Sequence, residues 1–257
     1  MADPLHQFQI EPLLPISVGG TNLSFTNSSL WMAIAVGCAY LLVYVDDVLI
    51  AAPPNSDDLT AAKTLVLSSF EARDLGAASL FLGMLITRDR AAKTIKLSQP
   101  RHIADLLAKF QMTDAKPYET PSSAAIKLTA EGEPLDTVTF PYSNAIGSLM
   151  YIASCTRPDI AQAVGALARY MAAPTTAHWT AVKHILRYLA GTPNYGITYG
   201  PDTFSLAAYC DASYAGCLDT RRSTTGYVFI LNGGAITWSS RLQSTVAVST
   251  TEVSVKW

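Results

Sequence analysis

The fold of this 257-residue chain is decided by the stretch Tyr40-Leu41-Leu42-Val43-Tyr44-Val45-Asp46-Asp47-Val48-Leu49-Ile50-Ala51. Two adjacent acids interrupt a run that is otherwise apolar and rich in β-branched residues. This pattern predicts a buried β-hairpin of Tyr40–Val45 and Val48–Ala52, with Asp46 and Asp47 in the turn. Carboxylates at the tip of such a hairpin suit the binding of Mg²⁺ against phosphate oxygens. The alternative is that Asp-Asp is simply a favourable turn pair.

Size and charge bound the classes of function. The length allows one or two domains with a sizeable core, and the net charge of −2 gives no general indication of nucleic-acid binding. The distribution is more informative, because the first base is Lys63 and residues 88–116 hold seven bases against Asp89, Asp105 and Asp114. This basic stripe can follow a phosphate backbone; the alternative is a solvated face.

The cysteines indicate a reducing environment. The chain has four, and none forms a Cys-X-X-Cys pair or a Cys/His spacing typical of a zinc module. So few cysteines in a chain of this length make a disulfide framework improbable, so we expect reduced thiols. They are Cys38, Cys155, Cys210 and Cys217.

The remaining pattern predicts an α+β fold. Helices are expected where apolar residues recur at helical spacing, and strands where the period is two. A Pro-containing polar stretch, residues 113–140, is expected to be a loop or linker. The expected helices are 56–70 (capped by Ser56), 100–110, 142–154, 158–171, 176–190 and one beginning at Ser249. The expected strands are 79–87, 94–98, 205–211, 226–231 and 235–240, with a turn at Asn232-Gly233-Gly234.

Many short motifs fall in one order along the chain. Together they resemble the Pol polyprotein of copia-type LTR retrotransposons, from late reverse transcriptase into RNase H, over about residues 40–252. Tyr44-Val45-Asp46-Asp47 is similar to the reverse-transcriptase YVDD box. The other matching motifs are Phe81-Leu82-Gly83-Met84, Leu97-Ser98-Gln99, Ile146-Gly147-Ser148-Leu149-Met150-Tyr151, Thr156-Arg157-Pro158-Asp159-Ile160, His178-Trp179, Leu186-Arg187-Tyr188-Leu189, Gly191-Thr192, Asp211-Ala212-Ser213-Tyr214-Ala215-Gly216, Arg222-Ser223-Thr224-Thr225-Gly226-Tyr227 and Ser249-Thr250-Thr251-Glu252.

The resemblance implies a reverse-transcriptase palm fragment with an incomplete polymerase site. Reverse transcriptases use two metal ions held by three aspartates. Asp46 and Asp47 match two of these, as ligands of Mg²⁺. The third belongs on an earlier strand, but Asp3 is the sole aspartate before Asp46 and its context does not match.

The same resemblance implies a truncated RNase H-like mixed sheet. Four carboxylates around two Mg²⁺ ions cut the RNA of a hybrid in that family. Asp211, expected to end the first strand, matches the first, and Glu252, expected in the first turn of the last helix, matches the second. We expect their carboxylates to lie within about 6 Å of each other, so that they share one ion. Alternatively, Ser249-Thr250-Thr251-Glu252 is a capping box that turns Glu252 back to the amide of Ser249.

Two structural roles are assigned in the matching motifs. Asp159 is expected at a helix entry, where its charge is favourable. Asp219 is expected in a turn between strands.

The first 39 residues differ from the rest. Met1-Ala2-Asp3-Pro4-Leu5-His6-Gln7-Phe8 and Ser24-Phe25-Thr26-Asn27-Ser28-Ser29-Leu30-Trp31-Met32 resemble the N-terminus of ATP synthase subunit a. In that family, the apolar run opening at Leu30 begins a membrane helix. Here the run of residues 30–45 is shorter than the ~20 residues that a membrane helix needs. A membrane span is therefore marginal, and the chain is interpreted as a chimera.

These observations give one hypothesis and two alternatives. The chain is interpreted as four segments: 1–39, similar to subunit a; 40–112, palm and thumb; 113–200, linker and connecting helices; and 201–257, RNase H-like. The inherited roles are RNA-directed DNA synthesis and hybrid cleavage, with RNA template, DNA primer and RNA–DNA hybrid as partners. The isolated chain is expected to be inactive, in the cytoplasm or nucleus. The alternatives are a non-catalytic nucleic-acid-binding remnant and a membrane fragment.

Overall fold

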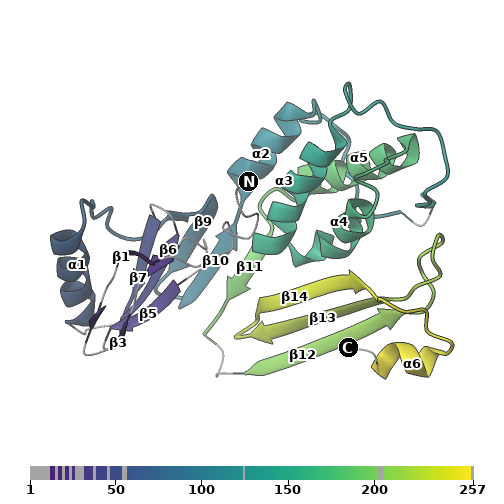
Figure 1. Ribbon diagram of the computed structural model, residues 1–257. Coiled ribbons are helices and arrows are strands. Elements are labelled where there is room, and N and C mark those ends of the chain that lie inside the picture. Colours follow the sequence, from purple (N-terminus) through teal and green to yellow (C-terminus); the bar gives the residue numbers. More distant parts are fainter. Residues whose placement is uncertain are drawn as a thin grey trace, which may run out of the picture. The chain divides into compact units, whose positions relative to one another are not determined.

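The computed structural model describes residues 12–14, 17–18, 21–22, 25–26, 32–36, 39–44, 47–53, 57–123, 125–201 and 205–255. The chain divides into two compact units, residues 1–82 and 83–257, and each is described by itself. Helices and antiparallel sheets are mixed in the chain (Figure 1), which confirms the predicted α+β fold.

The first unit is built around a three-stranded antiparallel sheet in the order β5-β6-β7. Its strands are β5 (Met32–Val36), β6 (Ala39–Tyr44) and β7 (Asp47–Ala51). The hairpin predicted from the sequence is β6 and β7, with Tyr40 opposite Ala51 and Tyr44 opposite Asp47. Two short pairs precede the sheet: β1 (Pro12–Leu14) with β4 (Phe25–Thr26), and β2 (Ser17–Val18) with β3 (Thr21–Asn22).

The apolar run after Leu30 does not form the helix that the subunit-a resemblance implies. Residues 32–36 are β5, which pairs with β6 from Met32 opposite Val43 to Val36 opposite Ala39. Strand β6 is hydrogen-bonded to β5 on one edge and to β7 on the other. The apolar run therefore forms strands of a sheet and not a helix. Among the described residues, no helix is long and apolar enough to cross a membrane.

Helix α1 (Asp58–Ser69) follows the hairpin and covers it with a narrow apolar stripe. Ala62 is 2% exposed, with Ile50, Ala52 and Val66 packed around it. Other apolar side chains of the helix, Leu59, Leu65 and Phe70, are exposed. The helix begins at Asp58, and its N-cap residue is Asp57. The predicted cap residue, Ser56, lies outside the described residues. Strand β8 (Leu80–Phe81) ends the unit.

The second unit begins with an antiparallel sheet of β9 (Met84–Asp89), β10 (Thr94–Ser98) and β11 (Gly196–Tyr199). Strand β10 lies where the sequence predicted it, whereas the predicted strand 79–87 is divided into β8 and β9 by a turn at residues 82–83. Strand β11 was not predicted. Gly196 faces Ser98, and a Cβ there would lie 2.1 Å from the carbonyl oxygen of Leu97. Glycine is therefore required for this close approach of two backbones.

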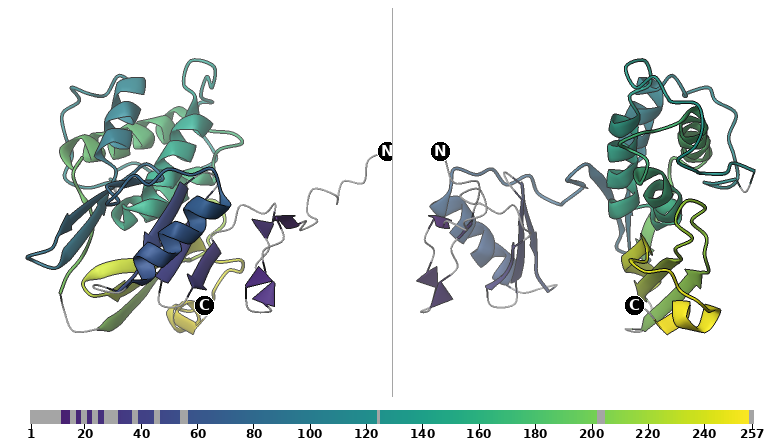
Figure 2. Two further views of the ribbon diagram at one scale, coloured as in Figure 1. Left: turned by 90° about the vertical axis from the view of Figure 1, so that its left-hand side faces the viewer. Right: turned by 45° about the vertical axis from the view of Figure 1, so that its right-hand side comes forward.

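Helices α2 to α5 form the main core of the second unit (Figures 1 and 2). They are α2 (Pro100–Lys109), α3 (Tyr142–Cys155), α4 (Ala161–Ala168) and α5 (Thr176–Gly191), with the one-turn 3₁₀ helix η2 (Pro158–Ile160) before α4. The predicted helix 158–171 is thus divided, and its α-helical part ends at Ala168. Buried apolar side chains from all four α-helices meet, among them Ile103, Leu106, Ile146, Leu149, Ile152, Val164, Leu167, Val182, Ile185 and Leu189.

A three-stranded antiparallel sheet follows, in the order β12 (Leu206–Ser213), β13 (Thr224–Leu231) and β14 (Gly234–Leu242). The predicted turn is confirmed: Asn232 and Gly233 both have positive φ, as a two-residue hairpin turn requires. Strand β14 lies beside α4 (Figures 1 and 2). Helix α6 (Thr250–Val255) lies beside β12.

Candidate functional site

The acid pair of the hairpin is placed by the register of β6 and β7. Tyr44 lies opposite Asp47, so the connection is Val45–Asp46 and Asp47 is the first residue of β7. The expectation that both acids lie in the turn is therefore wrong for Asp47, because the ladder extends one residue further. The Asp47 side chain is exposed. Asp46 lies outside the described residues.

Asp211 lies within strand β12 and does not end it. The ladder with β13 continues through Ala212 opposite Thr225 and Ser213 opposite Thr224, so the expected strand end is two residues too early. The carboxylate is exposed, and its Oδ1 accepts a hydrogen bond from the Ala212 amide at 2.8 Å. Eight residue pairs join β12 to β13, so the position of Asp211 is fixed by the sheet and not by a loop.

Glu252 lies in the first turn of α6, as predicted. Its amide donates to Ser249 Oγ at 3.2 Å, which is the side-chain half of a capping box. Its Oε2 accepts from the amide of Val248 at 2.8 Å, one residue before the expected Ser249. The structure therefore shows the capping geometry, and Glu252 turns toward the chain that enters its helix.

The carboxylates have the right chemistry for a hard divalent cation. Carboxylate oxygens are the ligands that Mg²⁺ takes from proteins, usually one or two of them with water in the other positions. Asp47 and Asp211 are exposed, so water can complete a coordination shell. Within the described residues, no three His, Cys, Asp or Glu side chains gather closely enough to hold a metal ion.

Asp159 has the structural role that the sequence predicted, as part of a larger network than expected. Arg157 is 1% exposed, and its guanidinium forms a salt bridge of 2.8 Å with Asp159. The same guanidinium donates to the carbonyl and the hydroxyl of Thr192, and Tyr188 donates its hydroxyl to Asp159 at 2.7 Å. Burial alone would raise the pKa of Asp159, but the hydrogen bonds from Arg157 and Tyr188 hold it below its usual value. Sequence reasoning missed Arg157, because a charged residue is rarely buried.

Asp219 ties the loop of residues 113–140 to the helices. Its Oδ1 accepts from the amide of Ala130 at 2.9 Å, and its Oδ2 accepts from the hydroxyl of Tyr170 at 2.8 Å. These hydrogen bonds lower the pKa of Asp219. Asp219 holds a tertiary contact, a role wider than that of the simple turn that was expected.

The cysteines of the described chain are free thiols. Cys155 is half-buried, Cys210 is exposed and Cys217 is buried. Cys38 lies outside the described residues.

The basic stripe is largely exposed. It runs from Arg88 along the β9–β10 hairpin and α2 to Lys116, and apart from the half-buried Lys96 its bases face solvent. Lys109 donates to Asn144. Exposure is what a phosphate contact requires, and it is also what a solvated face shows.

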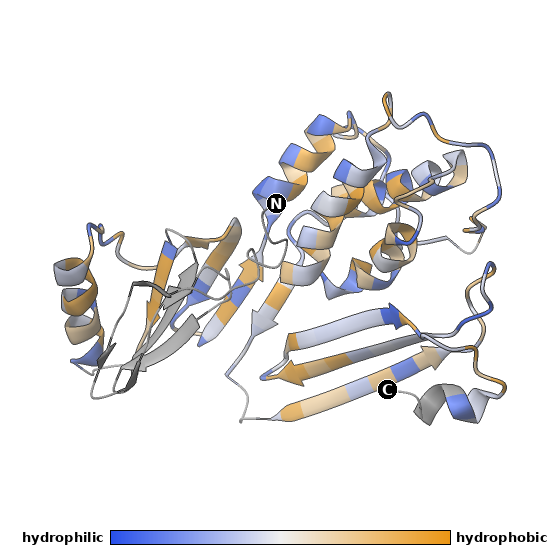
Figure 3. Ribbon diagram, viewed as in Figure 1, coloured by the Kyte–Doolittle hydropathy of each residue, from blue (hydrophilic) through white to orange (hydrophobic). Residues whose placement is uncertain are grey.

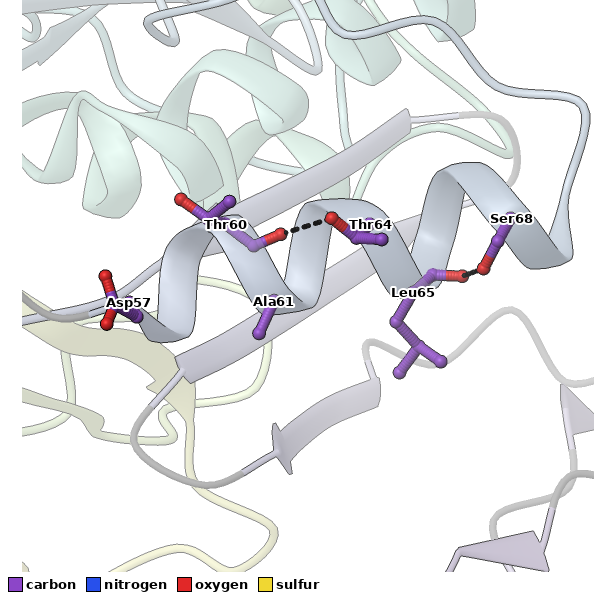
Figure 4. A pocket seen from close by; sticks show the side chains of 6 residues that line it. All are labelled: Asp57, Thr60, Ala61, Thr64, Leu65 and Ser68. Atoms are coloured by element: carbon purple, nitrogen blue, oxygen red, sulfur yellow. Dashed lines mark hydrogen bonds between the residues drawn. The ribbon is translucent and has the colours of Figure 1, made fainter.

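A hollow on α1 is lined by residues of that one helix (Figure 4). Its hydroxyls are satisfied locally: Thr64 donates to the Thr60 carbonyl at 2.9 Å, and Ser68 donates to the Leu65 carbonyl at 3.0 Å. Hydroxyls that bond back to their own helix have less to offer a ligand. We assign no function to this hollow.

The chain is similar to reverse transcriptases and to Pol polyproteins of transposons. A family model described as reverse transcriptase (RNA-dependent DNA polymerase) matches residues 23–124. The chain is 45% identical over 218 residues to the retrovirus-related Pol polyprotein from transposon TNT 1-94 of Nicotiana tabacum, covering 82% of this chain and 16% of that protein. No solved structure matches.

Two shorter relatives match over most of their own length. The chain is 34% identical over 220 residues to a putative transposon Ty5-1 protein of Saccharomyces cerevisiae, which is 84% of this chain and 70% of that protein. It is 35% identical over 221 residues to an uncharacterized mitochondrial protein of Arabidopsis thaliana, of which it covers 87%. The chain thus spans a small part of the Pol polyprotein and most of the shorter relatives.

A short stretch has a different relative. It is 59% identical over 34 residues, which is 13% of this chain, to the ATP synthase subunit a of Parvibaculum lavamentivorans. The subunit-a resemblance seen in the sequence therefore has a counterpart among known proteins.

Proposed function

The chain belongs to the copia-type retrotransposon Pol family, and from this premise we propose that it carries parts of two nucleic-acid-processing sites. Asp46 and Asp47 are the metal-binding carboxylates of a reverse-transcriptase palm. Asp211 and Glu252 are the first two carboxylates of an RNase H site. The proposed segments are 40–112 for palm and thumb, 113–200 for the connection and 201–257 for the RNase H part.

The observation that carries the polymerase proposal is the β6–β7 register. Tyr44 pairs with Asp47 across a two-residue connection, so Asp47 is the first residue of β7 and directly follows Asp46 in the sequence. This hairpin lies inside the range that the reverse-transcriptase family model matches. The exposed Asp47 on an otherwise apolar hairpin is difficult to explain by stability alone, whereas metal ions bound at this acid pair would stabilise the charges of phosphoryl transfer.

The RNase H proposal is supported by the position of Asp211 and α6. Asp211 lies on the strand beside which α6 is placed, and Glu252 is in the first turn of that helix. Glu252 accepts the Val248 amide in this structure. We propose that a divalent ion competes with this capping bond, so that Glu252 serves as a cap without metal and as a ligand with it.

We propose that a polypeptide of these 257 residues catalyses neither reaction alone, and that it works in the cytoplasm or nucleus. Asp3 is the sole aspartate before Asp46, so the polypeptide has no counterpart of the third polymerase aspartate. We also propose that it is a chimera whose start derives from a subunit-a sequence, because that relative is 59% identical over its 34 residues.

Primer extension and hybrid cleavage test these proposals together. The purified chain is incubated with oligo(dT)-primed poly(rA), or with a labelled RNA–DNA hybrid, in Mg²⁺ or Mn²⁺. The expected result is neither extension nor cleavage above background. Asp46→Asn and Asp211→Asn are the matched controls. Extension that Asp46→Asn abolishes, or cleavage that Asp211→Asn abolishes, would contradict the proposed inactivity while supporting the assigned residues.

A second candidate function is nucleic-acid binding without catalysis, and the exposure of the basic stripe favours it. Phosphate contacts release counterions, so affinity should fall steeply with salt. A gel shift of the hybrid that weakens from 50 to 200 mM salt, and weakens further in Arg88→Gln with Arg90→Gln, would support it. Arg73→Gln, at an exposed base of the first unit, is the control. Equal binding by the stripe variant and the control would exclude the stripe.

A further inference from the structure

A basic groove lies along one side of α5. It encloses about 400 Å³ between α5 and the loop that follows α2. Its cations are Lys116, Lys183 and Arg187, and every residue that lines it is either basic or uncharged. The groove was not evident from the sequence, because its loop side and α5 meet only in the folded chain.

Arg187 is held in place within the groove. Its Nε donates to the carbonyl oxygen of Lys116, and its guanidinium carbon lies 3.7 Å from the ring centroid of Tyr118. A guanidinium fixed by one hydrogen bond and one ring contact keeps its terminal N–H groups in a set direction. Such a fork recognises phosphate oxygens with little further loss of side-chain freedom.

The aromatic rings of the groove are engaged with one another. Tyr118 stacks on His184, with centroids 4.1 Å apart and planes 16° apart. Two groups that both lie about 4 Å from one ring centroid must occupy opposite faces, so Tyr118 lies between His184 and Arg187. His184 is also anchored, because its Nε2 lies 3.0 Å from the carbonyl oxygen of Thr120 and therefore carries the proton of that hydrogen bond.

The occupied ring faces and open charges of the groove favour binding of a duplex over binding of a single strand. Single-strand sites depend on aromatic faces that are free to stack with bases. Here both faces of Tyr118 are occupied, whereas the charges are left open: in the described part of the chain the ion pairs are Lys63–Asp74 and Arg157–Asp159, neither of which involves the groove. Positive charge without free stacking surface favours the backbone of a duplex.

We propose that this groove binds the phosphodiester backbone of a nucleic-acid duplex through Lys116, Lys183 and Arg187. The inference deepens the proposed role in nucleic-acid processing and rests on it for the choice of an RNA–DNA hybrid as the duplex. The groove contacts need no metal ion. Binding is therefore measured in EDTA, where failure of the metal sites cannot affect the result.

The experiment is fluorescence anisotropy of the full chain with a labelled RNA–DNA hybrid, titrated at several salt concentrations. Lys183→Glu and the double variant Lys183→Gln with Arg187→Gln are compared with Arg241→Gln, an exposed base on β14. We expect the salt slope, −d log K/d log[salt], to fall by about one for each groove cation removed. Arg241→Gln should retain the wild-type slope.

Two measurements keep the test decisive. Thermal melting identifies a variant that fails to fold; Lys183 is exposed, so Lys183→Glu should melt like the wild type even if loss of Arg187 disturbs Tyr118. Unlabelled single-stranded RNA and inorganic phosphate serve as competitors. An unchanged salt slope in Lys183→Glu would overturn the inference, as would competition by phosphate or single strand as effective as that by hybrid.

Discussion

The connecting helices and the C-terminal sheet bury their apolar residues to very different extents. In α3 and α5, Ile146, Leu149, Ile152, Leu186 and Leu189 are completely buried. On β12 and β13, by contrast, large apolar side chains remain accessible: Leu206 is 61% exposed, Tyr209 63%, Tyr227 36% and Phe229 37%. Figure 3 shows hydrophobic residues along β12 and β13 as well as between the helices.

Cross-strand pairing explains where the exposed residues lie. Residues directly opposite each other share a face of the sheet, so Leu206, Ala208 and Cys210 lie on one face with Leu231, Phe229 and Tyr227. The opposite face includes Trp238, which donates its indole N–H to the carbonyl of Ala153 in α3. Tyr209 lies on this face too, but on β12, the strand that is not adjacent to β14, and it stays exposed. The sheet thus has one face toward the helices and one exposed face. The helices bury their apolar residues among themselves, whereas the sheet leaves large apolar side chains exposed.

The largest expected effect concerns the buried network of the helical region. Arg157→Met removes a guanidinium that bonds both Asp159 and Thr192, and leaves their acceptors without its donors. Breaking a buried ion pair is strongly destabilising, here by about 3 kcal/mol because Asp159 is partly exposed. Urea unfolding followed by circular dichroism measures it. A free energy of unfolding within about 0.5 kcal/mol of the wild type would show that the helices do not depend on this network.

The link between helices and sheet should have an intermediate effect. Trp238→Phe removes one hydrogen bond to Ala153 with little change in packing, and we expect a loss of about 1–2 kcal/mol. Tyr209→Phe, on the same strand face and largely exposed, is the control and should change little. Hydrogen exchange would show faster exchange in β12–β14 than in α3 and α5. Uniform acceleration across both regions would contradict a separate sheet.

Acid should weaken the helical region through its carboxylates. The pKa values of Asp159 and Asp219 are lowered in the folded state, so each stabilises the fold above its unfolded pKa of about 3.9. That stabilisation is lost as the pH falls below about 4 toward the folded pKa. The melting temperature measured from pH 6 to pH 2.5 should therefore fall less in Asp159→Asn than in the wild type. Parallel curves would exclude this linkage.

The smallest expected change in stability is on the exposed sheet face. Phe229→Thr should lower the free energy of unfolding by about 1 kcal/mol, because its side chain is 37% exposed and so loses less buried apolar surface than a core residue. It should nevertheless lower the fluorescence of a dye that binds apolar surface, and raise solubility. Leu149→Ala, in the helical core, should destabilise the protein, and it should therefore raise the fluorescence of the dye and lower solubility. Unchanged dye binding in Phe229→Thr would show that this face is covered in solution.

The elements that sequence predicted best are those with local signals. The helical spacing of Trp179, Val182 and Ile185 and the Asn232-Gly233 turn are fixed by neighbours in the chain. Strand β11 was missed because its partner β10 lies about a hundred residues earlier, and no local pattern encodes that pairing. The break of helix 158–171 after Ala168 was also not evident.

The candidate sites divide in the same way. The hairpin carrying Asp46 and Asp47 followed from apolar runs on both sides of two acids, and the place of Glu252 in the first turn of the last helix followed from the matching motif. The buried Arg157 and the groove of Lys116, Tyr118 and Arg187 did not, because they depend on segments that meet only in the folded chain. Asp47 lies in β7 and not in the predicted turn, and Asp211 lies within β12 and not at its predicted end.

Titration of the full chain with Mn²⁺, followed by electron paramagnetic resonance of the free ion, tests the central claim most directly. We predict two sites that bind Mn²⁺ weakly, because each pair of carboxylates leaves several coordination positions to water. Asp46→Asn with Asp47→Asn should remove one site, and Asp211→Asn the other, each leaving its counterpart unchanged. Bound Mn²⁺ that is the same in the wild type and in both variants would contradict the assignment of these carboxylates.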